Sequence, residues 1–166
     1  MESKFLNRKS TKKGFGLIEI VIVTAVIGIA FVGLVAFLIN SAGTTFRVTR
    51  NTEASALAEE GIEAARSLRD ESWTSRVATL TAGATYYPVI SASKWTLTTT
   101  NPGLVNNLYT RTVVVENVNR DANDNIAVAG TADPNTKKVT VVVSWNENQD
   151  VQDVTIVTYI TNFLGN

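Results

Sequence analysis

The residue whose position is most unusual for its chemistry is Glu19, an acid inside a long apolar stretch. From Phe15 to Ile39 there are 25 residues, and Glu19 is the only charged one. As an α-helix this stretch is about 37 Å long, enough to cross a hydrocarbon core of about 30 Å. A carboxylate at the centre of such a helix costs about 2.5–3.5 kcal/mol, and less near an end, where it can snorkel. An isolated anchor has no use for this acid, so Glu19 predicts a cationic partner.

The sequence itself offers a candidate for that partner. Lys12, Lys13 and Gly14 precede Phe15 at the start of the apolar stretch. If the chain is cut after Gly14, Phe15 carries a free α-amino group one helical turn away from Glu19. The Glu19 carboxylate could then neutralise this amine, either in its own chain or in a neighbouring one.

Residues 12–19, KKGFGLIE, resemble the processing motif of type IV prepilins. The resemblance implies that a prepilin peptidase cuts after Gly14, that the amine of Phe15 is methylated, and that Glu19 serves filament assembly. The close resemblance covers roughly residues 8–73. Within it, residues 58–70 also resemble the segment after the anchor in minor-pilin-like and pseudopilin-like sequences.

Two positions depart from the pattern of that family. Gly16 stands where threonine or serine is common, and Ala36 lies in a region where many members carry a proline. A kink at that place is therefore not expected on the ground of a proline, although Gly28 and Gly33 could loosen the helix.

Composition narrows the classes of function. The chain has 166 residues and contains neither cysteine nor histidine, which excludes disulfides and removes the commonest general base and metal ligand. Residues 1–14 hold five basic residues and one acid, for a net charge of +4. Residues 15–166 hold 10 basic and 14 acidic residues, for a net charge of −4. We expect no enzyme, no cofactor and no nucleic-acid partner.

The basic residues at 1–14 also predict topology. They keep this end cytoplasmic by the positive-inside rule, so the rest of the chain after the single span lies outside the cytoplasmic membrane. The alternative is an ordinary secretory signal peptide that is cut near Ala42. Its apolar region is usually about 7–15 residues long, shorter than the stretch found here, and a buried acid would be unusual in it.

A helical period returns after the polar residues 40–45 and continues to about Asp70. Its apolar and small residues recur at spacings of three, four or multiples of them, at Phe46, Ala54, Leu57, Gly61, Ala65 and Leu68, and Ala58 and Ile62 widen the same face. The charged residues of this segment are interpreted as a solvated face, or as contacts between filament subunits; they are Glu59, Glu60, Glu63, Arg66 and Arg69. Two ion pairs of helical spacing are expected, Glu63–Arg66 and Arg66–Asp70. We expect one helix from Phe15 to Arg69, whose second half needs a cover for its apolar stripe.

The composition after Trp73 predicts strands that supply this cover. Alternating apolar and polar residues indicate five of them, at 86–90, 95–99, 108–115, 139–145 and 154–161, with a hairpin turn at 146–150. No helical pattern separates the later strands, which favours an antiparallel meander. The expected fold is α+β and pilin-like, with a cleaved leader at 1–14, a transmembrane and filament-core helix at 15–40, its amphipathic continuation at 41–72 and a β-rich domain at 73–166.

Other candidate sites are weaker. Asp121, Asp124 and Asp133 could gather oxygen ligands for calcium, but Ile126 replaces the glycine of the EF-hand loop, so we favour a solvated loop and expect no metal. The residues Trp73, Trp95 and Trp145 are interpreted as packing residues, with an exposed adhesive patch as the alternative. Thr96–Thr100 is interpreted as an exposed strand edge in preference to a glycan site.

The resemblance implies a structural subunit of a type IV pilus or a related filament. Its expected partners are copies of itself and other pilins, prepilin peptidase, the pilus assembly machinery and, for the precursor, the cytoplasmic membrane. The assembled filament would be extracellular or periplasmic. The alternatives are a pseudopilin of a type II secretion system, an unassembled membrane-anchored binding protein and, last, an anchored enzyme.

Overall fold

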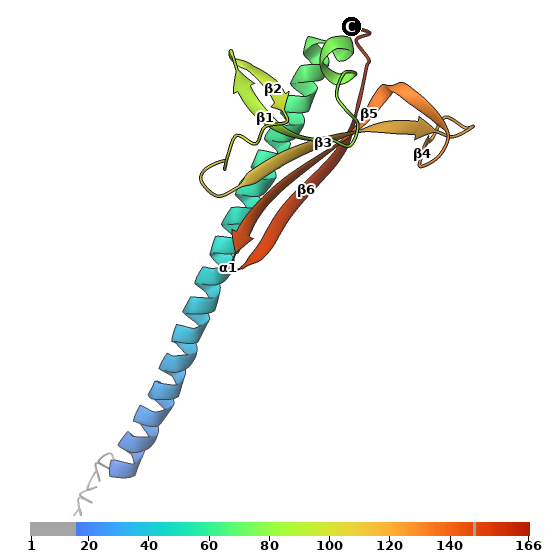
Figure 1. Cartoon of the computed structure of the whole chain (residues 1–166). Coiled ribbons are helices and arrows are strands. Elements are labelled where there is room, and N and C mark those ends of the chain that lie inside the picture. Colours follow the sequence, from blue (N-terminus) through green and yellow to red (C-terminus); the bar gives the residue numbers. More distant parts are fainter. Residues whose placement is uncertain (1–15, 148) are drawn as a thin grey trace, which may run out of the picture. The chain divides into compact units, whose positions relative to one another are not determined.

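One long helix, α1, begins at Leu17 and ends at Glu71 (Figure 1). The computed structural model describes residues 16–147 and 149–166, so the predicted leader at 1–14 and the predicted cleavage junction Gly14–Phe15 lie outside the described residues. The expected continuity of the two helical stretches is confirmed. The helix can continue through residues 17–71 because this range contains no proline. The chain divides into two units, Met1–Phe46 and Arg47–Asn166, and the boundary falls inside α1.

The first unit contributes the apolar half of α1. Every described residue from 16 to 46 is exposed within the chain. Its polar hydroxyl groups find partners on the same helix: Thr24 donates to the carbonyl oxygens of Ile20 and Val21, both at 3.0 Å. Thr44 bonds its helix in the same way, to the Asn40 carbonyl at 3.1 Å. Such internal pairing is what a lipid environment demands of polar groups.

In the second unit α1 buries one stripe against the sheet. The buried residues of the helix are small or aliphatic: Ala54, Ala58, Gly61, Ile62, Ala64, Ala65 and Leu68. Gly61 lets the two layers approach closely, because a Cβ at this position would lie 2.7 Å from Cγ1 of Val141. The expectation that Phe46 belongs to the same stripe is wrong: Phe46 is 67% exposed, because it lies before the part of the helix that the sheet covers.

Among the described residues, seven further elements follow α1: a π-helical turn, η1, and six strands. Their bounds are η1 Trp73–Val77, β1 Thr85–Ser91, β2 Lys94–Thr98, β3 Thr110–Arg120, β4 Ile126–Ala127, β5 Thr131–Glu147 and β6 Asp150–Thr161. All pairings between these strands are antiparallel, in the order β2-β1-β3-β5-β6, and β4 pairs with β3. The predicted α+β arrangement, with a long helix packed on an antiparallel sheet, is confirmed.

The predicted meander is wrong in one respect, since β3 lies beside β1 and not beside β2. β1 and β2 form a hairpin whose two turn residues, Ala92 and Ser93, have φ of 50° and 62°, as a tight right-twisted hairpin requires. β1 pairs with β3 only through Thr85 and Tyr86. Pro88 lies two residues after Tyr86 and has no N–H to donate to a ladder, which explains why this pairing is short.

The core lies between the stripe of α1 and the inward face of the sheet. Five valines of β3 and β5 are buried there: Val113, Val115, Val139, Val141 and Val143. Trp73 and Trp145 are also buried, and Trp95 packs against the same cluster. The interpretation of the three tryptophans as packing residues is therefore confirmed.

Candidate functional site

The candidate assembly residue Glu19 lies in the first turn of α1. The Gly16 carbonyl accepts a hydrogen bond from the N–H of Glu19 at 2.9 Å and another from Ile20 at 3.3 Å, which starts the helix. The unpaired N–H groups of a helix start favour a negative charge there. The side chain of Glu19 is exposed. Gly14 and Phe15, the candidate cleavage and methylation residues, lie outside the described residues.

Glu19 has no charged neighbour of either sign within residues 16–46. The first basic residue after it is Arg47, which is 28 positions further along the chain. No ion pair involves Glu19 among the described residues. A cation for this carboxylate must therefore come from the residues before Gly16 or from another molecule.

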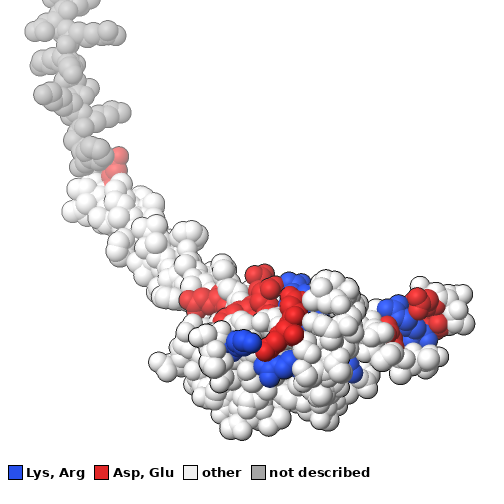
Figure 2. Space-filling view, turned by 90° about the horizontal axis from the view of Figure 1, so that it is seen from above, with Lys and Arg blue, Asp and Glu red and all other residues white. Residues whose placement is uncertain are grey.

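The helix around Glu19 is long and apolar enough to cross a membrane, judged by length and composition. None of its apolar side chains between Leu17 and Ile39 is buried within the chain. Figure 2 shows this segment almost entirely without charged residues, whereas acidic and basic side chains gather on the globular unit. The segment therefore presents apolar surface on all sides.

The second unit places another glutamate of α1 in a different environment. Glu60 accepts a 2.7 Å bond from Nη1 of Arg111, whose side chain is 6% exposed. Arg111 also donates to the Leu57 carbonyl at 3.2 Å, and its guanidinium lies 5.6 Å from the centroid of the Trp95 ring. The interpretation of Glu60 as part of a solvated face holds only in part: its side chain is 43% exposed, but a buried arginine on β3 also binds it. An isolated arginine in a strand pattern gave no signal for this role.

The other predicted ion pairs have mixed outcomes. Glu63 and Arg66 form the expected pair. Arg66 and Asp70 do not pair, because Arg69 lies beside Asp70 at 2.8 Å and its guanidinium also stacks 4.7 Å from the Phe163 ring. The Glu63–Arg66 pair is exposed on both sides, and a single exposed pair contributes about 0.2–1 kcal/mol.

A second polar cluster fastens α1 to the end of the sheet. The buried Tyr109 hydroxyl donates to Glu53 at 2.7 Å and to the Arg50 carbonyl at 3.3 Å. Burial, together with the bond to the Glu53 carboxylate, raises the pKa of Tyr109 to about 12. Arg47 and Arg50 both lie within 4.0 Å of Glu147, at 3.4 and 3.7 Å. These groups satisfy one another.

The acids proposed as calcium ligands are occupied by protein groups. Asp133 accepts bonds from the Thr136 hydroxyl and from Arg120, both at 2.7 Å, which together lower the pKa of Asp133 to about 2. Asp121 accepts the backbone N–H groups of Asn123 and Asn125. No group of three acidic side chains that could hold a metal occurs in the part of the chain that the structure describes. The interpretation as a loop between strands fits this arrangement.

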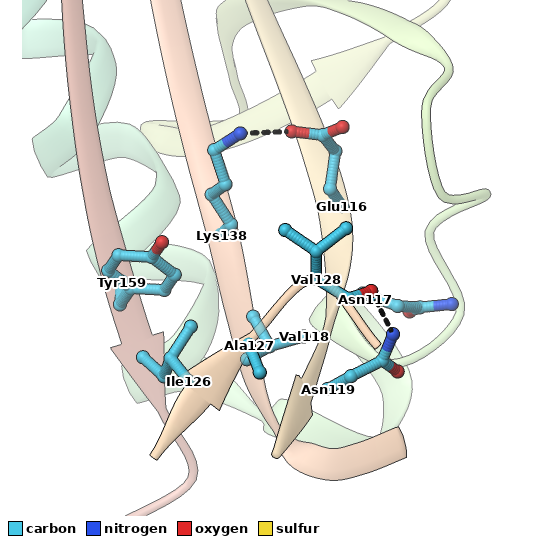
Figure 3. A pocket seen from close by; sticks show the side chains of 9 residues that line it. All are labelled: Glu116, Asn117, Val118, Asn119, Ile126, Ala127, Val128, Lys138 and Tyr159. Carbon is cyan, nitrogen blue, oxygen red and sulfur yellow. Dashed lines mark hydrogen bonds and ion pairs between the residues drawn. The ribbon is translucent and has the colours of Figure 1, made fainter. Parts of the chain in front are cut away.

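A hollow of about 460 Å³ lies where β4 folds over the sheet (Figure 3). Glu116 and Lys138 form an ion pair across it at 2.9 Å, and Glu116 raises the pKa of Lys138. The Asn119 amide donates to the Val128 carbonyl at 3.2 Å. The lining therefore contains one paired acid and base, two amides, the Tyr159 hydroxyl group and apolar side chains.

One comparison with known proteins gives a match. Residues 9–35 match the family model described as the prokaryotic N-terminal methylation motif, which is the signature of type IV pilins and pseudopilins. The match includes Lys12, Lys13, Gly14, Phe15 and Glu19. No curated protein and no solved structure matches the chain. Together with the α+β arrangement, the motif supports a precursor that is type IV pilin-like or pseudopilin-like.

Proposed function

We propose, from the methylation motif at residues 9–35, that this chain is the structural subunit of a type IV pilus or a related filament. The precursor is anchored in the cytoplasmic membrane with its N-terminus in the cytoplasm. Prepilin peptidase cuts it after Gly14, and the new first residue, Phe15, is methylated. The mature chain then polymerises through its N-terminal helix, together with copies of itself and other pilins.

The mechanism is a transfer of apolar surface between two apolar environments. The bilayer stores the exposed half of α1 until assembly. In the filament this half leaves the lipid and enters a bundle of identical helices, so its apolar side chains remain away from water. Because the burial is retained, the transfer needs no large gain in hydrophobic free energy.

Glu19 supplies the specific contact within that bundle. A free amine on Phe15 would lie one turn from the Glu19 carboxylate, and the two would pair in a medium of low dielectric constant, where pairing matters most. The observation that supports this role is the isolation of Glu19: residues 16–46 contain no cation, and the helix carries no other charge before Arg47.

Intact mass spectrometry tests the processing step. We expect a mature chain that begins at Phe15 and carries one methyl group on its amine. The unprocessed chain, or a chain that begins near Gly43, would contradict this. The second result would indicate a secretory signal peptide and would remove the anchor.

Electron microscopy of sheared surface material, with this chain identified by mass spectrometry, tests the assembled state. An abundant homopolymer indicates a major pilin, and a trace component indicates a minor pilin. A polymer confined to the periplasm favours a pseudopilin of a type II secretion system, a class that carries the same N-terminal motif. A processed chain that remains monomeric in the membrane would overturn the proposal in favour of an anchored binding protein.

A further inference from the structure

The β6 edge of the sheet lacks the features that usually protect an exposed edge strand. β6 forms one edge and pairs with β5 along all of its 12 residues without a shift of register. Exposed edges in monomeric proteins usually carry lysine, proline or a bulge. Residues 150–161 contain no lysine, proline or glycine, and their only charges, Asp150 and Asp153, lie in the first four positions. The remaining part of the β6 edge is suited to pairing with another strand.

A hollow beside β6 could receive the side chains of such a strand. It has a volume of about 460 Å³ and is lined by residues of both α1 and β6. Ile62 and Ile156 contribute apolar surface, while Glu59, Glu63 and Arg66 contribute charge. A strand added to a sheet edge gains main-chain hydrogen bonds and places alternate side chains in pockets of this kind.

We propose that β2 of a second copy adds to the β6 edge, so that the sheet continues from one subunit to the next. The proposal rests on the proposed function, because it describes a contact inside the filament. Each copy has one β6 edge and one β2 edge, so this contact is head-to-tail and can repeat without closing, as a filament requires. Four antiparallel pairings separate β2 from β6, which makes these two strands parallel in copies of equal orientation.

Charge and side-chain pattern select one register for this pairing. Lys94 opposite Asp153 joins unlike charges at the start of both strands. The same register places Thr96 opposite Thr155 on the outer face and Leu97 opposite Ile156 on the face toward the helix. Leu97 and Ile156 both already pack against the core from that face. Opposite charges, paired threonines and paired aliphatic residues are all favourable cross-strand neighbours.

Two contacts within the chain must change when β2 is added. Arg76 donates from Nη2 to the Trp95 carbonyl at 3.3 Å and to the Thr96 hydroxyl at 3.4 Å. Both bonds are long, and Arg76 can keep its 3.3 Å contact with Glu71 after leaving the strand. Lys94 binds Glu71 at 3.0 Å with a side chain that is 66% exposed, so it can also reach an external carboxylate.

Disulfide cross-linking tests the register, because the natural chain has no cysteine. The double variant Lys94→Cys/Asp153→Cys is expressed as the full chain, and its filaments are treated with an oxidant. Neighbouring strands lie about 4.8 Å apart, within the range that a disulfide can bridge. We expect a ladder of covalent multimers beyond the dimer on non-reducing gels, because each copy has both ends of the contact.

A matched control carries Lys94→Cys with Asn123→Cys, since Asn123 is exposed and lies on the loop between β3 and β4, outside the β6 segment that would pair with β2. We expect no ladder from this control. Filaments of normal appearance that give no ladder in the Lys94/Asp153 variant would overturn the edge contact and leave the proposed function intact. Absence of filaments from cells with the unaltered chain would overturn the proposed function and this contact together.

An exchange of charges gives an independent reading that needs no cysteine. Lys94→Glu and Asp153→Lys each place like charges opposite one another, so each should lower the fraction of chain found in sheared filaments. The double exchange restores an attractive pair and should recover that fraction toward the unaltered level. Equal loss in both single variants and in the double exchange, with the folded unit intact by circular dichroism, would contradict the proposed register.

Discussion

The two halves of α1 differ in what surrounds their side chains. Residues 17–46 expose apolar side chains on all sides, whereas the stripe from Ala54 to Leu68 is buried under the sheet. Their glutamates differ accordingly: Glu60 has a buried arginine of its own chain as partner, and Glu19 has none among the described residues. One continuous helix therefore joins a unit that is complete by itself to a segment whose surface needs another molecule or a membrane. The predictions below separate these two requirements.

The largest effect is expected from removing the first half altogether. A fragment that begins at Thr44 keeps the whole unit Arg47–Asn166, so we expect a soluble, folded monomer that forms no filaments. The proposed contact at the β6 edge involves only one short strand of each copy. Stable complexes usually bury about 1,200–2,000 Å² of surface, so this contact alone should not hold copies of the fragment together. Circular dichroism and sedimentation measure the two properties. A disordered fragment, or one that still polymerises, would contradict the division.

The next largest effect concerns Glu19 alone. We expect Glu19→Val to be synthesised, inserted and cleaved like the unaltered chain, since loss of the charge favours a location in lipid. Its incorporation into filaments should be lost, because the Phe15 amine would be buried without a partner. Breaking a buried pair by removing one member costs about 3–5 kcal/mol, and a polymer repeats that cost at every subunit. Sheared filaments and membranes are compared by quantitative immunoblotting.

Thr24→Val is the matched control for this variant. It also removes a polar group from the apolar half, but the Thr24 hydroxyl is already satisfied by carbonyls of its own helix. We therefore expect normal assembly. Glu19→Val protein that is cleaved and appears in filaments at the normal level would indicate a solvated, snorkelling Glu19 and would refute the pairing with Phe15.

In the second half of α1, substitutions are expected to lower the stability of the folded unit and not to prevent filament assembly. Arg111→Ala should lower the free energy of unfolding of the fragment by about 2 kcal/mol, because a buried guanidinium with two hydrogen-bond partners is lost. Glu60→Ala should cost a similar amount, about 2 kcal/mol, because it leaves the buried Arg111 guanidinium with only the Leu57 carbonyl as a partner. Urea titration of both variants and of the double variant measures the coupling. Additive losses would show that Arg111 acts by packing alone.

The sequence predicted the elements better than the contacts between them. Long periodic segments identified α1 and five of the six strands, because apolar spacing is a local property of the chain. The position of β2 was not predictable, since it depends on where a loop returns and on the missing N–H of Pro88. β4 was missed because its two residues, Ile126 and Ala127, are too few to give a pattern.

The same division applies to the candidate site. Lys12, Gly14, Phe15 and Glu19 are adjacent in the sequence, so their motif could be recognised without a structure, although their roles remain predictions. The partner of Glu60 lies 51 positions away on β3. A single sequence gives no indication that Arg111 turns toward the helix, because arginine is ordinarily a surface residue.

The smallest effect is expected at Tyr109, which joins the start of the covered half of α1 to the sheet. Tyr109→Phe removes the bond to Glu53, and we expect a loss of about 1 kcal/mol in the free energy of unfolding near neutral pH. The loss should shrink in alkali. Because burial raises the pKa of Tyr109 from 10.0 to about 12, the neutral form favours the fold, and that contribution is complete below pH 10 and disappears as the pH rises toward 12. The Phe variant has no hydroxyl to ionise at this position, so its free energy of unfolding falls less steeply over the same pH interval.

Tyr159→Phe, at a residue that is 46% exposed, is the control. It should change the free energy of unfolding by less than about 0.5 kcal/mol and keep the dependence on alkaline pH of the unaltered fragment. Urea unfolding at several pH values measures both variants, and a Tyr109→Phe deficit that stays constant up to pH 12 would show that this hydroxyl does not sense its burial.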